Sequence, residues 1–355
     1  MGRISRQINI GKVKVGGGAP VTVQSMTKTD TRDVSATVAE IKKLEEAGCD
    51  IVRLAVPDME AAKSLGAIKK EANIPIVSDI HFDYRLALEA IRQGVDGMRI
   101  NPGNIGSKVR IKAVVDAVKE RGIPIRIGVN SGSLEKEILK RYGSPTAEAL
   151  AESAFRHVRI LEDLDFKDIK ISVKSTSVMK MIEAYKIIAE KTDYPLHLGV
   201  TEAGTFKMGT IKSAIGIGAL LAEGIGDTIR VSLTGDPVEE IYVGIDILKS
   251  LGIRKNGIEL ISCPGCGRLE IDLMKLVKDV ETRISDIDLP RPIKVAILGC
   301  VVNGPGEASE ADIGIAGGRG KGMLYKDGKL VKSFKEERLV DELVEEIHKF
   351  TAGQQ

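Results

Sequence analysis

Three cysteines near the C-terminus have the spacing of metal ligands. Cys263 and Cys266 lie in the run Cys-Pro-Gly-Cys, and Cys300 lies downstream in a Gly/Pro-rich loop, Gly-Cys-Val-Val-Asn-Gly-Pro-Gly-Glu. The N-terminal run Met-Gly-Arg-Ile-Ser-Arg lacks the apolar core of a signal peptide, so we expect a cytoplasmic protein. Thiols stay reduced there, which favours a metal centre over a disulfide.

The sequence favours an iron–sulfur cluster at these cysteines and leaves two alternatives open, a zinc site and redox-active or inert thiols. Cys-Pro-Gly-Cys-Gly resembles one knuckle of a zinc ribbon, but Cys300 has no cysteine or histidine close by to form a second pair. Cysteine loops with adjacent Pro and Gly suit an iron–sulfur cluster. Three thiolates leave one metal position for an oxygen or nitrogen ligand, or for substrate. Cys49 begins an apolar strand and is expected to be a small buried side chain.

Short apolar segments alternate with amphipathic helical patterns through the first two-thirds of the chain. The expected strands are residues 21–26, 51–56, 75–80, 97–101, 124–129, 168–173, 196–200 and 228–233. Eight such units predict a (β/α)8 barrel over residues 1–255. A doubly wound open sheet is the alternative, but no Gly-x-Gly-x-x-Gly turn follows the first strand. Residues 130–146 are expected to form a longer loop or lid.

The remaining residues, 256–355, predict a smaller α/β domain that carries the three cysteines. Strands are expected at 257–262, 293–298, 312–316, 322–325 and 329–334, and helices at 269–284 and 337–350. Asp327-Gly328 has the sequence of a two-residue hairpin turn.

Polar residues interrupt the barrel strands with a period of two, although parallel strands are normally apolar on both faces. They are Arg53, Asp79, His81, Arg99, Asn101, Arg126, Asn130, Lys170, Ser172, Lys174, His197, Arg230 and Ser232. Side chains alternate across a strand, and helices cover the outer face, so these residues are expected to face the barrel axis. Most lie near the carboxyl ends of the strands, where barrel enzymes place their active sites.

Cations outnumber acids in this set, which predicts an anionic substrate. Any one arginine is equally well explained by an internal salt bridge, but so many like charges are costly to bury together unless an anion binds. Arginine forks fit phosphate, so we expect a small, multiply anionic substrate, with a diphosphate favoured. Glu202 is the best acid–base candidate, and His81 and His197 are candidates for acid–base chemistry or phosphate binding. His157 and His348 are expected to be structural or exposed.

The composition argues against nucleic-acid and membrane partners. The chain has 355 residues, with 52 Lys+Arg against 50 Asp+Glu, a formal net charge of +2, 3% aromatic residues and no Trp. This balance provides neither a basic surface nor a platform for base stacking. No apolar run is long enough to cross a membrane.

Six motifs together resemble one enzyme family, 4-hydroxy-3-methylbut-2-enyl diphosphate synthase, an iron–sulfur enzyme of the non-mevalonate isoprenoid pathway. They are Val-Gln-Ser-Met-Thr (23–27), Asp-Ile-His-Phe (79–82), Arg-Ile-Asn-Pro-Gly-Asn (99–104), Gly-Val-Thr-Glu-Ala-Gly (199–204), Ser-Cys-Pro-Gly-Cys-Gly-Arg (262–268) and the Cys300 run (299–307). The likeness extends from about residue 8 to the last helix, and the chain resembles the short bacterial form, which lacks an extra middle domain.

The resemblance implies a [4Fe–4S] cluster bound by the three cysteines and, in the resting enzyme, by Glu307. It implies reductive ring opening and dehydroxylation of 2-C-methyl-D-erythritol 2,4-cyclodiphosphate, with two electrons from ferredoxin or flavodoxin. Glu202 would be the acid. Family substrate contacts match Arg53, Arg99, Arg126, Asn130 and Lys174, and polar groups beside the cluster match Ser262 and Asn303.

The fold implied by the resemblance is a barrel followed by a domain like half of a sulfite reductase. The resemblance also implies a homodimer in which the cluster of one subunit caps the barrel of the other. Two other functions stay open on the residues alone. One is a barrel transferase resembling dihydropteroate synthase with an added zinc knuckle, and the other is a non-catalytic binding protein with a structural metal. The polar barrel interior argues against the second, and the colour of anaerobically purified protein would distinguish iron from zinc.

Overall fold

The computed structural model describes residues 3–254, 257–284, 287, 292–318 and 320–352. The chain forms two compact units, residues 1–254 and 255–355, and each is described by itself. The expected domain boundary between residues 255 and 256 lies outside the described residues. No helix in the described ranges is long and apolar enough to cross a membrane.

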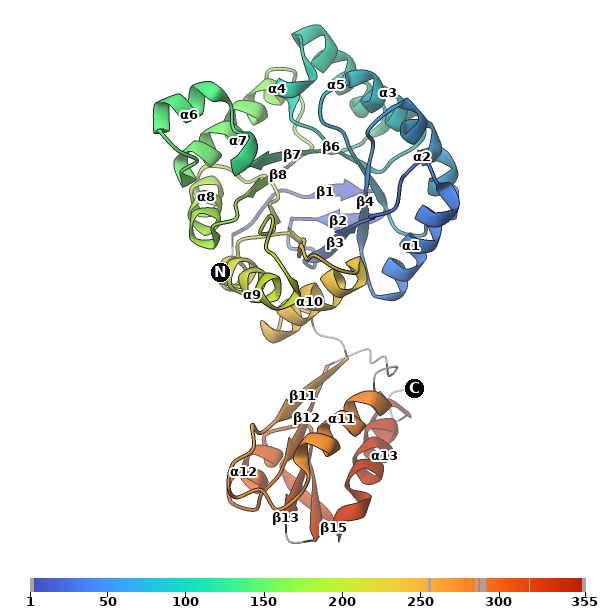
Figure 1. Cartoon of the computed structure of the whole chain (residues 1–355), viewed down its shortest axis with the longest axis vertical. Helices are drawn as coiled ribbons and strands as arrows, with labels where there is room; N and C mark the ends of the chain where they lie inside the picture. The colour runs from blue at the N-terminus through green and yellow to red at the C-terminus, as the bar shows by residue number, and fades with distance from the viewer. Residues whose placement is uncertain (1–2, 255–256, 285–286, 288–291, 319, 353–355) are drawn as a thin grey trace. The chain divides into compact units, whose positions relative to one another are not determined.

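The first unit is a barrel of eight parallel strands surrounded by helices, which confirms the predicted fold class (Figure 1). The strands are β3 (Thr22–Met26), β4 (Ile51–Ala55), β5 (Ile76–Asp79), β6 (Gly97–Arg99), β7 (Ile125–Asn130), β8 (Ile169–Lys174), β9 (His197–Leu198) and β10 (Thr228–Ile229). The ring closes because β10 pairs with both β3 and β9, and a bridge between Ile171 and Leu196 joins β8 to the segment that begins β9.

A helix follows each barrel strand and covers the outer face. The outer helices are α1 (Val34–Glu46), α2 (Met59–Glu71), α3 (Tyr84–Arg92), α5 (Lys108–Arg121), α7 (Ala147–Glu162), α8 (Val178–Lys191), α9 (Phe206–Ala222) and α10 (Pro237–Ser250). Strand β4 shows how the alternation works: Val52 and Leu54 belong to the core beneath the helices, whereas Ile51 belongs to a separate apolar cluster at the barrel axis. Arg53 therefore faces the axis as well.

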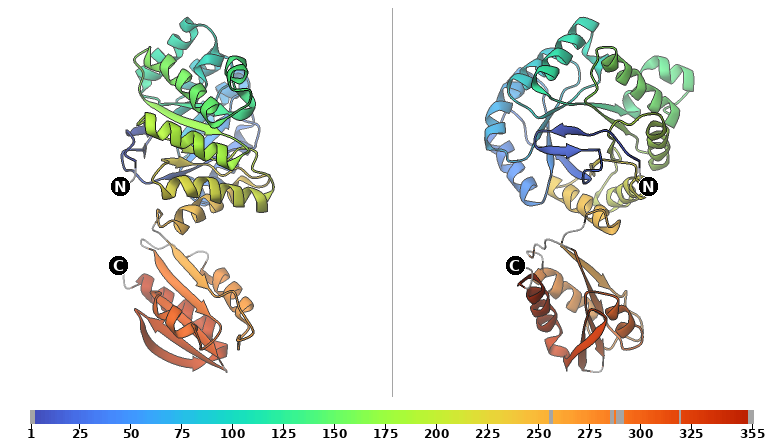
Figure 2. Two further views of the ribbon diagram at one scale, coloured as in Figure 1. Left: turned by 90° about the vertical axis from the view of Figure 1, so that its left-hand side faces the viewer. Right: turned by 180° about the vertical axis from the view of Figure 1, so that it is seen from behind.

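A hairpin of β1 (Ile8–Ile10) and β2 (Val13–Val15) closes the amino-terminal end of the barrel. Its apolar residues pack with Ile51 and Val77, which lie near the starts of β4 and β5. Figure 2 shows the hairpin across the opening in the view from behind. Because this end is plugged by apolar side chains, a substrate has access only from the carboxyl ends of the strands.

The structure corrects two local expectations in the barrel. Residues 130–146 are not a plain loop, because they contain a 3-10 turn (Ser131–Ser133) and α6 (Lys136–Tyr142). Strands β9 and β10 are also much shorter than expected, with two residues each. Arg230 and Ser232 therefore lie just beyond a strand rather than within it.

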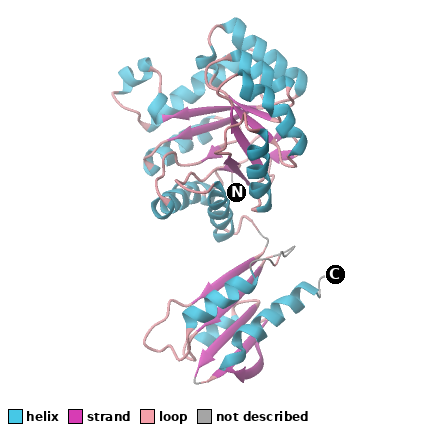
Figure 3. Cartoon of the chain, turned by 45° about the vertical axis from the view of Figure 1, so that its right-hand side comes forward, coloured by secondary structure: helices cyan, strands magenta, loops and turns pink. Residues whose placement is uncertain are grey.

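The second unit is a five-stranded mixed sheet. Its strands are β11 (Ile258–Ser262), β12 (Ile293–Leu298), β13 (Ile313–Gly318), β14 (Lys321–Lys326) and β15 (Lys329–Lys335), the first three parallel and the last two antiparallel. Helices α11 (Leu273–Ile284) and α13 (Leu339–Ala352) pack side by side on one face of it. Figure 3 draws these strands in magenta and the helices in cyan. Asp327 and Gly328 both have positive φ, 47° and 78°, as expected for their hairpin turn.

A short helix, α12 (Gly304–Ser309), follows β12 and packs closely on β13. A Cβ atom at Gly314 would lie 2.4 Å from the carbonyl oxygen of Ala308, so this approach requires glycine. Residues 304–307, expected to be part of an irregular loop, are thus helical. Glu307 lies in the first turn of α12.

Candidate functional site

Strand pairing in the barrel brings the polar residues together in rows. Asp79, Arg99, Arg126 and Lys170 occupy paired positions on four successive strands, and Asn130 pairs with Lys174. We call Arg53, Arg99, Arg126, Lys174 and Arg230 the cation cluster. Their positive charges act on one another, and burial and this repulsion lower the pKa of Lys174 well below its usual value.

Asp79 is the carboxylate partner of two arginines of the cation cluster. Its Oδ1 lies 3.1 Å from Arg99 Nη1 and its Oδ2 lies 3.5 Å from Arg53 Nε. Burial acts to raise the pKa of Asp79, but the positive charges of Arg53 and Arg99 outweigh it and hold that pKa at about 2. Burial lowers the pKa of Arg53 to about 10 despite this partner. The side chain of His81 is half-exposed, and its Nε2 lies 2.9 Å from Arg99 Nη1.

The carbonyl group of Gly128 holds Arg99 and Asn101 in place. Arg99 Nη2 donates to this oxygen at 2.9 Å and Asn101 Nδ2 donates at 3.0 Å, while Asn101 Oδ1 accepts the Gly128 N–H at 2.9 Å. A Cβ atom at Gly128 would lie 2.6 Å from Arg99 Nε, so the guanidinium can lie against β7 only because this residue is glycine. Asn101 therefore aligns β6 with β7 through both its amide nitrogen and its amide oxygen.

Arg126 has donors that no described residue accepts. It is 3% exposed, and its Nε and Nη2 have no hydrogen-bond partner among the described residues. Burial, followed by the charges of Arg53 and Arg99, lowers its pKa well below the usual value. Buried donors without partners are costly, and an arriving anion would satisfy them.

Lys170 and His197 lie deeper than the sequence suggested. Lys170 is 2% exposed and, with Arg126 of the cation cluster and Ile8 and Ile10 of the hairpin that plugs the barrel, borders a cavity of about 10 Å3. That space holds one water at most. His197 is fully buried, with Nδ1 2.7 Å from Thr228 Oγ1 and no partner at Nε2 among the described residues. Both residues support the floor beneath the cation cluster.

Glu240 is an acid at this site that the sequence analysis missed. It is 2% exposed, although it lies in the first turn of α10. Its Oε1 accepts the Leu233 N–H at 3.0 Å, and its Oε2 lies 3.2 Å from Ser25 Oγ and 3.6 Å from Arg230 Nη2. Its position in the sequence did not indicate a buried role, because an acid in the first turn of a helix is usually an exposed residue that interacts with the helix dipole.

Glu202 lies at the rim, on the loop that follows β9. It is exposed and has a φ of 50°, which is uncommon for a residue other than glycine. The neighbouring loop, after β10, is tied to this one by the Thr234 N–H, which donates to the Gly204 carbonyl at 3.1 Å. Asn130 and Ser232 are half-buried near the strand ends. The structure thus groups Glu202, Asn130 and Ser232 with the loops above the cation cluster.

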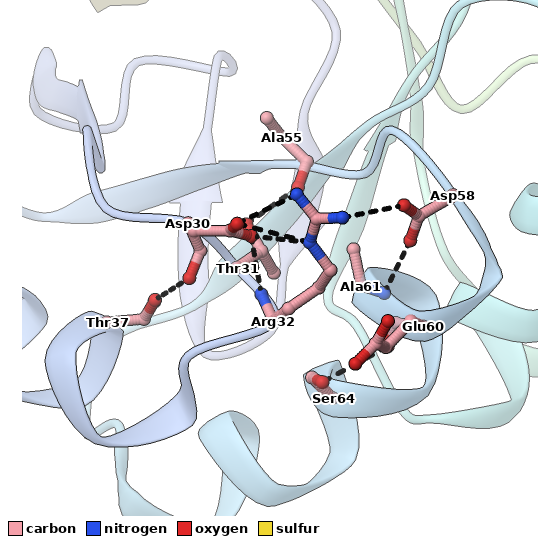
Figure 4. A network of polar contacts seen from close by, with 9 residues as sticks. All are labelled: Asp30, Thr31, Arg32, Thr37, Ala55, Asp58, Glu60, Ala61 and Ser64. Atoms are coloured by element: carbon pink, nitrogen blue, oxygen red, sulfur yellow. Dashed lines mark hydrogen bonds and ion pairs between the residues drawn. The ribbon is translucent and has the colours of Figure 1, made fainter.

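Polar contacts also fix the loops after β3 and β4 (Figure 4). Arg32 donates to Asp30 at 2.8 Å and lies 3.3 Å from Asp58, the N-cap residue of α2. Thr31 Oγ1 donates to the carbonyl of Ala55 at 2.7 Å. These contacts hold the end of β4, which carries Arg53.

The three C-terminal cysteines line one pocket in the second unit. This cysteine pocket, about 390 Å3 in volume, is bordered by Ser262, Cys263, Cys266, Arg268, Cys300, Asn303 and Glu307, together with neighbouring residues. The strands β11 and β12 pair in parallel, which brings the loops after them together. In the described residues, no three His, Cys, Asp or Glu side chains lie close enough together to hold a single metal ion. Cys49 lies apart in the barrel core, where burial raises its pKa to about 12.

The loop backbone favours the thiolate form at two of these cysteines. The backbone N–H of Arg268, and then its side chain, lower the pKa of Cys266. The backbone N–H groups of Asn303 and Val302 lower the pKa of Cys300. Thiolates are the form that binds metals, so the donor set suits a soft metal centre.

Comparisons with known proteins agree over both units. The family model "GcpE TIM-barrel domain" matches residues 5–245, and "GcpE protein C-terminal domain" matches residues 259–349. A protein of Clostridium acetobutylicum is 63% identical over 343 residues, covering 97% of this chain and 98% of the relative. One of Clostridium perfringens is 64% identical, covering 96% and 97% respectively. Both are named 4-hydroxy-3-methylbut-2-en-1-yl diphosphate synthase (flavodoxin).

Solved structures share the barrel at low identity. A dihydropteroate synthase from Stenotrophomonas maltophilia matches with a TM-score of 0.51 and 13% identity, covering 70% of this chain and 97% of that one. An N-acetylneuraminic acid synthetase from Leptospira borgpetersenii matches with a TM-score of 0.50 and 14% identity, covering 79% and 98%. Both likenesses concern the fold alone, and they give no support to a transferase function. The family matches and the close relatives confirm the resemblance: this chain belongs to the GcpE family, the 4-hydroxy-3-methylbut-2-enyl diphosphate synthases.

Proposed function

We propose that this protein reductively opens the ring of 2-C-methyl-D-erythritol 2,4-cyclodiphosphate and forms 4-hydroxy-3-methylbut-2-enyl diphosphate. The reaction takes up two electrons and a proton, and a hydroxyl leaves as water. Close relatives across nearly the full chain carry the name of this activity. The observation on this chain that supports it most directly is the cation cluster, in which Arg126 has buried donors left for an anion.

The cation cluster supplies binding and orientation. Arg53 and Arg99 share Asp79, which leaves a net positive charge for two phosphates. We assign phosphate binding to Arg53, Arg99, Arg126, Lys174 and Arg230, and polar contacts with the substrate to Asn130 and Ser232. Asp79, His81 and Asn101 align the arginines, while Lys170 and His197 form the polar floor. Glu202, at the rim, is the proton donor in this assignment.

The cysteine pocket fits a [4Fe–4S] cluster. Its three thiols and Glu307 offer soft sulfur donors and one harder, more easily displaced oxygen donor, and its volume exceeds what one ion needs. Ser262 and Asn303 are polar neighbours of this site. When bound, the cluster supplies the electrons for the reduction. Both relatives are named for flavodoxin, which favours flavodoxin over ferredoxin as the electron donor here. The need for reduced thiols suits a cytoplasmic location.

We also propose a homodimer in which the cluster domain of one subunit serves the barrel of its partner. An apolar surface supports subunit association: Met208, Ile211 and Ile215 are exposed on α9, and Met179 is exposed on neighbouring α8. Mixing Arg126→Ala and Cys300→Ser proteins tests the sharing, at a substrate concentration too low for the Arg126→Ala protein alone to show turnover. Recovery of activity after subunit exchange is expected, because a mixed dimer then has one intact barrel served by one intact cluster. Absence of recovery in a verified mixed dimer would contradict it.

The function itself is tested with anaerobically purified protein. The expected preparation is brown, contains iron, and converts the cyclic diphosphate when reduced flavodoxin is supplied. A colourless, zinc-containing protein, or an iron-loaded protein that leaves the cyclic diphosphate unchanged with an active donor, would overturn the proposal.

A further inference from the structure

His157 lies between two loops of the substrate face, although its position in the sequence suggested a structural or exposed residue. It is on α7, is 4% exposed, and follows Ser153 by one helical turn on the same buried face. One side of its ring meets the turn after β6, and the other side faces the segment after β7. Asn101 lies in the first of these segments, and Asn130, the last residue of β7, directly precedes the second.

The first contact fixes the protonation state of the ring. The backbone N–H of Gly103 donates to His157 Nδ1 at 3.2 Å. A nitrogen that accepts a hydrogen bond cannot carry a proton, so the ring must be neutral with its proton on Nε2. Burial lowers the pKa of His157, and Arg156 lowers it further, against the opposing charge of Glu135. A Cβ atom at Gly103 would lie 2.8 Å from Cε1 of the ring, so a side chain there would displace the ring.

The second contact involves the start of α6. His157 Nε2 lies 3.5 Å from Glu135 Oε1, beyond a normal hydrogen bond but close enough for electrostatic attraction. The other oxygen, Oε2, accepts Ser153 Oγ at 2.7 Å. Glu135 is the N-cap residue of α6, so Ser153 and His157 together hold the segment after β7 against α7.

The Gly103 contact explains how Asn101 can reach across to β7. Asn101 is the N-cap residue of α4 (Pro102–Ile105), and an Asn there usually satisfies a first-turn N–H with its side chain. Asn101 makes no such side-chain bond, because its amide is used at Gly128. His157 accepts the first-turn N–H of Gly103 instead. Gly128 in turn accepts Arg99 Nη2.

We propose that neutral His157 is a positioning residue for the substrate site, because it caps α4 in place of Asn101 and so leaves Asn101 free to align Gly128 and Arg99. His157 does not contact the substrate itself and acts on substrate binding through Asn101, Gly128 and Arg99. It rests on the proposed function to the extent that the cation cluster binds the diphosphate.

Two variants of similar size separate the acceptor from the packing. His157→Leu removes the acceptor and leaves the Gly103 N–H buried without a partner, whereas His157→Asn places an amide oxygen near the former Nδ1. We expect His157→Leu to raise the KM for the cyclic diphosphate roughly tenfold with little change in kcat, the pattern for lost binding. His157→Asn should restore most of the affinity. Iron content should be native in both, because His157 lies in the barrel unit.

Nitrogen-15 spectra of histidine-labelled protein give a test that does not depend on activity. The chain has four histidines, so the signal lost in the variants identifies His157. At neutral pH we expect the neutral form with the proton on Nε2. In uniformly labelled protein, the Gly103 amide should exchange faster in His157→Leu than in His157→Asn. A proton on Nδ1, an imidazolium, or equal impairment of the two variants would overturn the proposal.

Binding of inorganic pyrophosphate separates this proposal from the proposed function. If the native protein bound pyrophosphate but did not turn over the cyclic diphosphate, the proposed reaction would be wrong. The order of pyrophosphate affinities, native and His157→Asn above His157→Leu, would still test the role of His157. If His157→Leu did not fold, the tautomer of the native protein and the affinity of His157→Asn would decide.

Discussion

Arg230 and Glu240 form a charge pair across the loop that joins β10 to α10, with 3.6 Å between Arg230 Nη2 and Glu240 Oε2. The carboxylate is 2% exposed, and its other oxygen holds the Leu233 N–H of the same loop. Glu240 thus fixes both the loop backbone and the arginine before it. Asp79 pairs in the same way with Arg53 and Arg99, and both carboxylates offset part of the positive charge of the cation cluster.

Glu240→Gln is expected to weaken substrate binding about tenfold. The amide keeps an acceptor for Leu233, but it removes the charge that holds Arg230, so the guanidinium loses its preferred position. Calorimetric titration with the cyclic diphosphate measures the effect. The matched control is Glu239→Gln, an exposed neighbour in the same helical turn, which should bind normally. Native or tighter binding by the Glu240 variant would contradict this role.

Arg126→Met should change stability and binding in opposite directions. Arg126 is buried among like charges without a partner for two of its nitrogens, so a methionine of similar length relieves repulsion and desolvation. We expect the free energy of unfolding to rise by about 1–3 kcal/mol. Substrate binding should weaken by about 1.5–3 kcal/mol, the range for a lost charge-assisted hydrogen bond. Urea unfolding and calorimetry measure the two quantities, with exposed Arg121→Met as the control.

Loss of stability in the substrate-free Arg126→Met protein would show that Arg126 already has a compensating partner. Unchanged binding would remove Arg126 from the phosphate site.

Asp79 should make stability depend on pH in the acid range. Its folded-state pKa of about 2 lies below the ordinary value of 3.8, so its contribution is fully present above about pH 4 and is lost as the pH falls toward 2. A shift of this size corresponds to about 2–3 kcal/mol. Asp79→Asn should therefore be less stable than the native protein by about that amount at neutral pH. The difference should shrink below pH 4, where the native carboxyl also becomes neutral.

Urea unfolding between pH 2 and 7 tests this dependence on Asp79. Asp116→Asn, at an exposed position on α5, should lie close to the native protein throughout. A constant difference between native and Asp79→Asn protein across the range would show that the charge of Asp79 is not responsible.

The sequence predicted the features that depend on the alternation of polar and apolar residues along a strand. It missed the features that depend on contacts between distant segments of the chain. The period of two at Arg99 and Asn101 located the barrel axis, because the pleat of a strand decides which face a side chain takes. The same pattern could not distinguish Lys170, at the plugged end, from Lys174 near the opening. That distinction requires the β1–β2 hairpin, whose three-residue strands are too short to have a clear period.

The sequence missed Glu240, and gave no sign of the proposed positioning role of His157, for a related reason. Each lies on a helix whose spacing explains it as an ordinary cap or core residue, and each acquires its role from a chain segment far away in sequence. His157 meets Gly103, 54 residues earlier, and Glu240 meets Ser25, 215 residues earlier. Such pairings follow from closure of the barrel and not from any local motif.

Replacing Cys300 with Ser is expected to abolish cluster binding while the barrel stays folded, because the cysteine pocket and the barrel belong to separate compact units. Iron content and visible absorbance measure the loss, and circular dichroism checks the fold. Cys49→Ser is the matched control: Cys49 is 4% exposed in the barrel core and should not affect iron content. Loss of iron from the Cys49 variant would mean that the ligands are wrongly assigned.

Glu307 is the ligand candidate that departs most from a plain structural role. It lies in the first turn of α12, seven residues after Cys300, and it lines the cysteine pocket although its side chain is exposed. An acid in a first helical turn is ordinarily explained by the helix dipole. At Glu307 that explanation accounts for the charge but not for its place beside three thiols.

Glu307→Ala and Glu307→Asp distinguish these two roles. If Glu307 serves only the helix dipole, Asp in the same turn should replace it, and iron should be retained in both variants with a small loss of stability, about 0.3–1 kcal/mol. If Glu307 is the oxygen ligand, Glu307→Ala should still assemble some cluster, lose iron faster under a chelator and lose most of its activity, because three thiolates leave one position without a protein donor. Electron paramagnetic resonance of the reduced native protein should change on substrate addition, and the Glu307→Ala spectrum should differ from the native one before any substrate is added. A Glu307→Ala protein with the native spectrum, native iron retention and normal turnover would exclude Glu307 as a ligand.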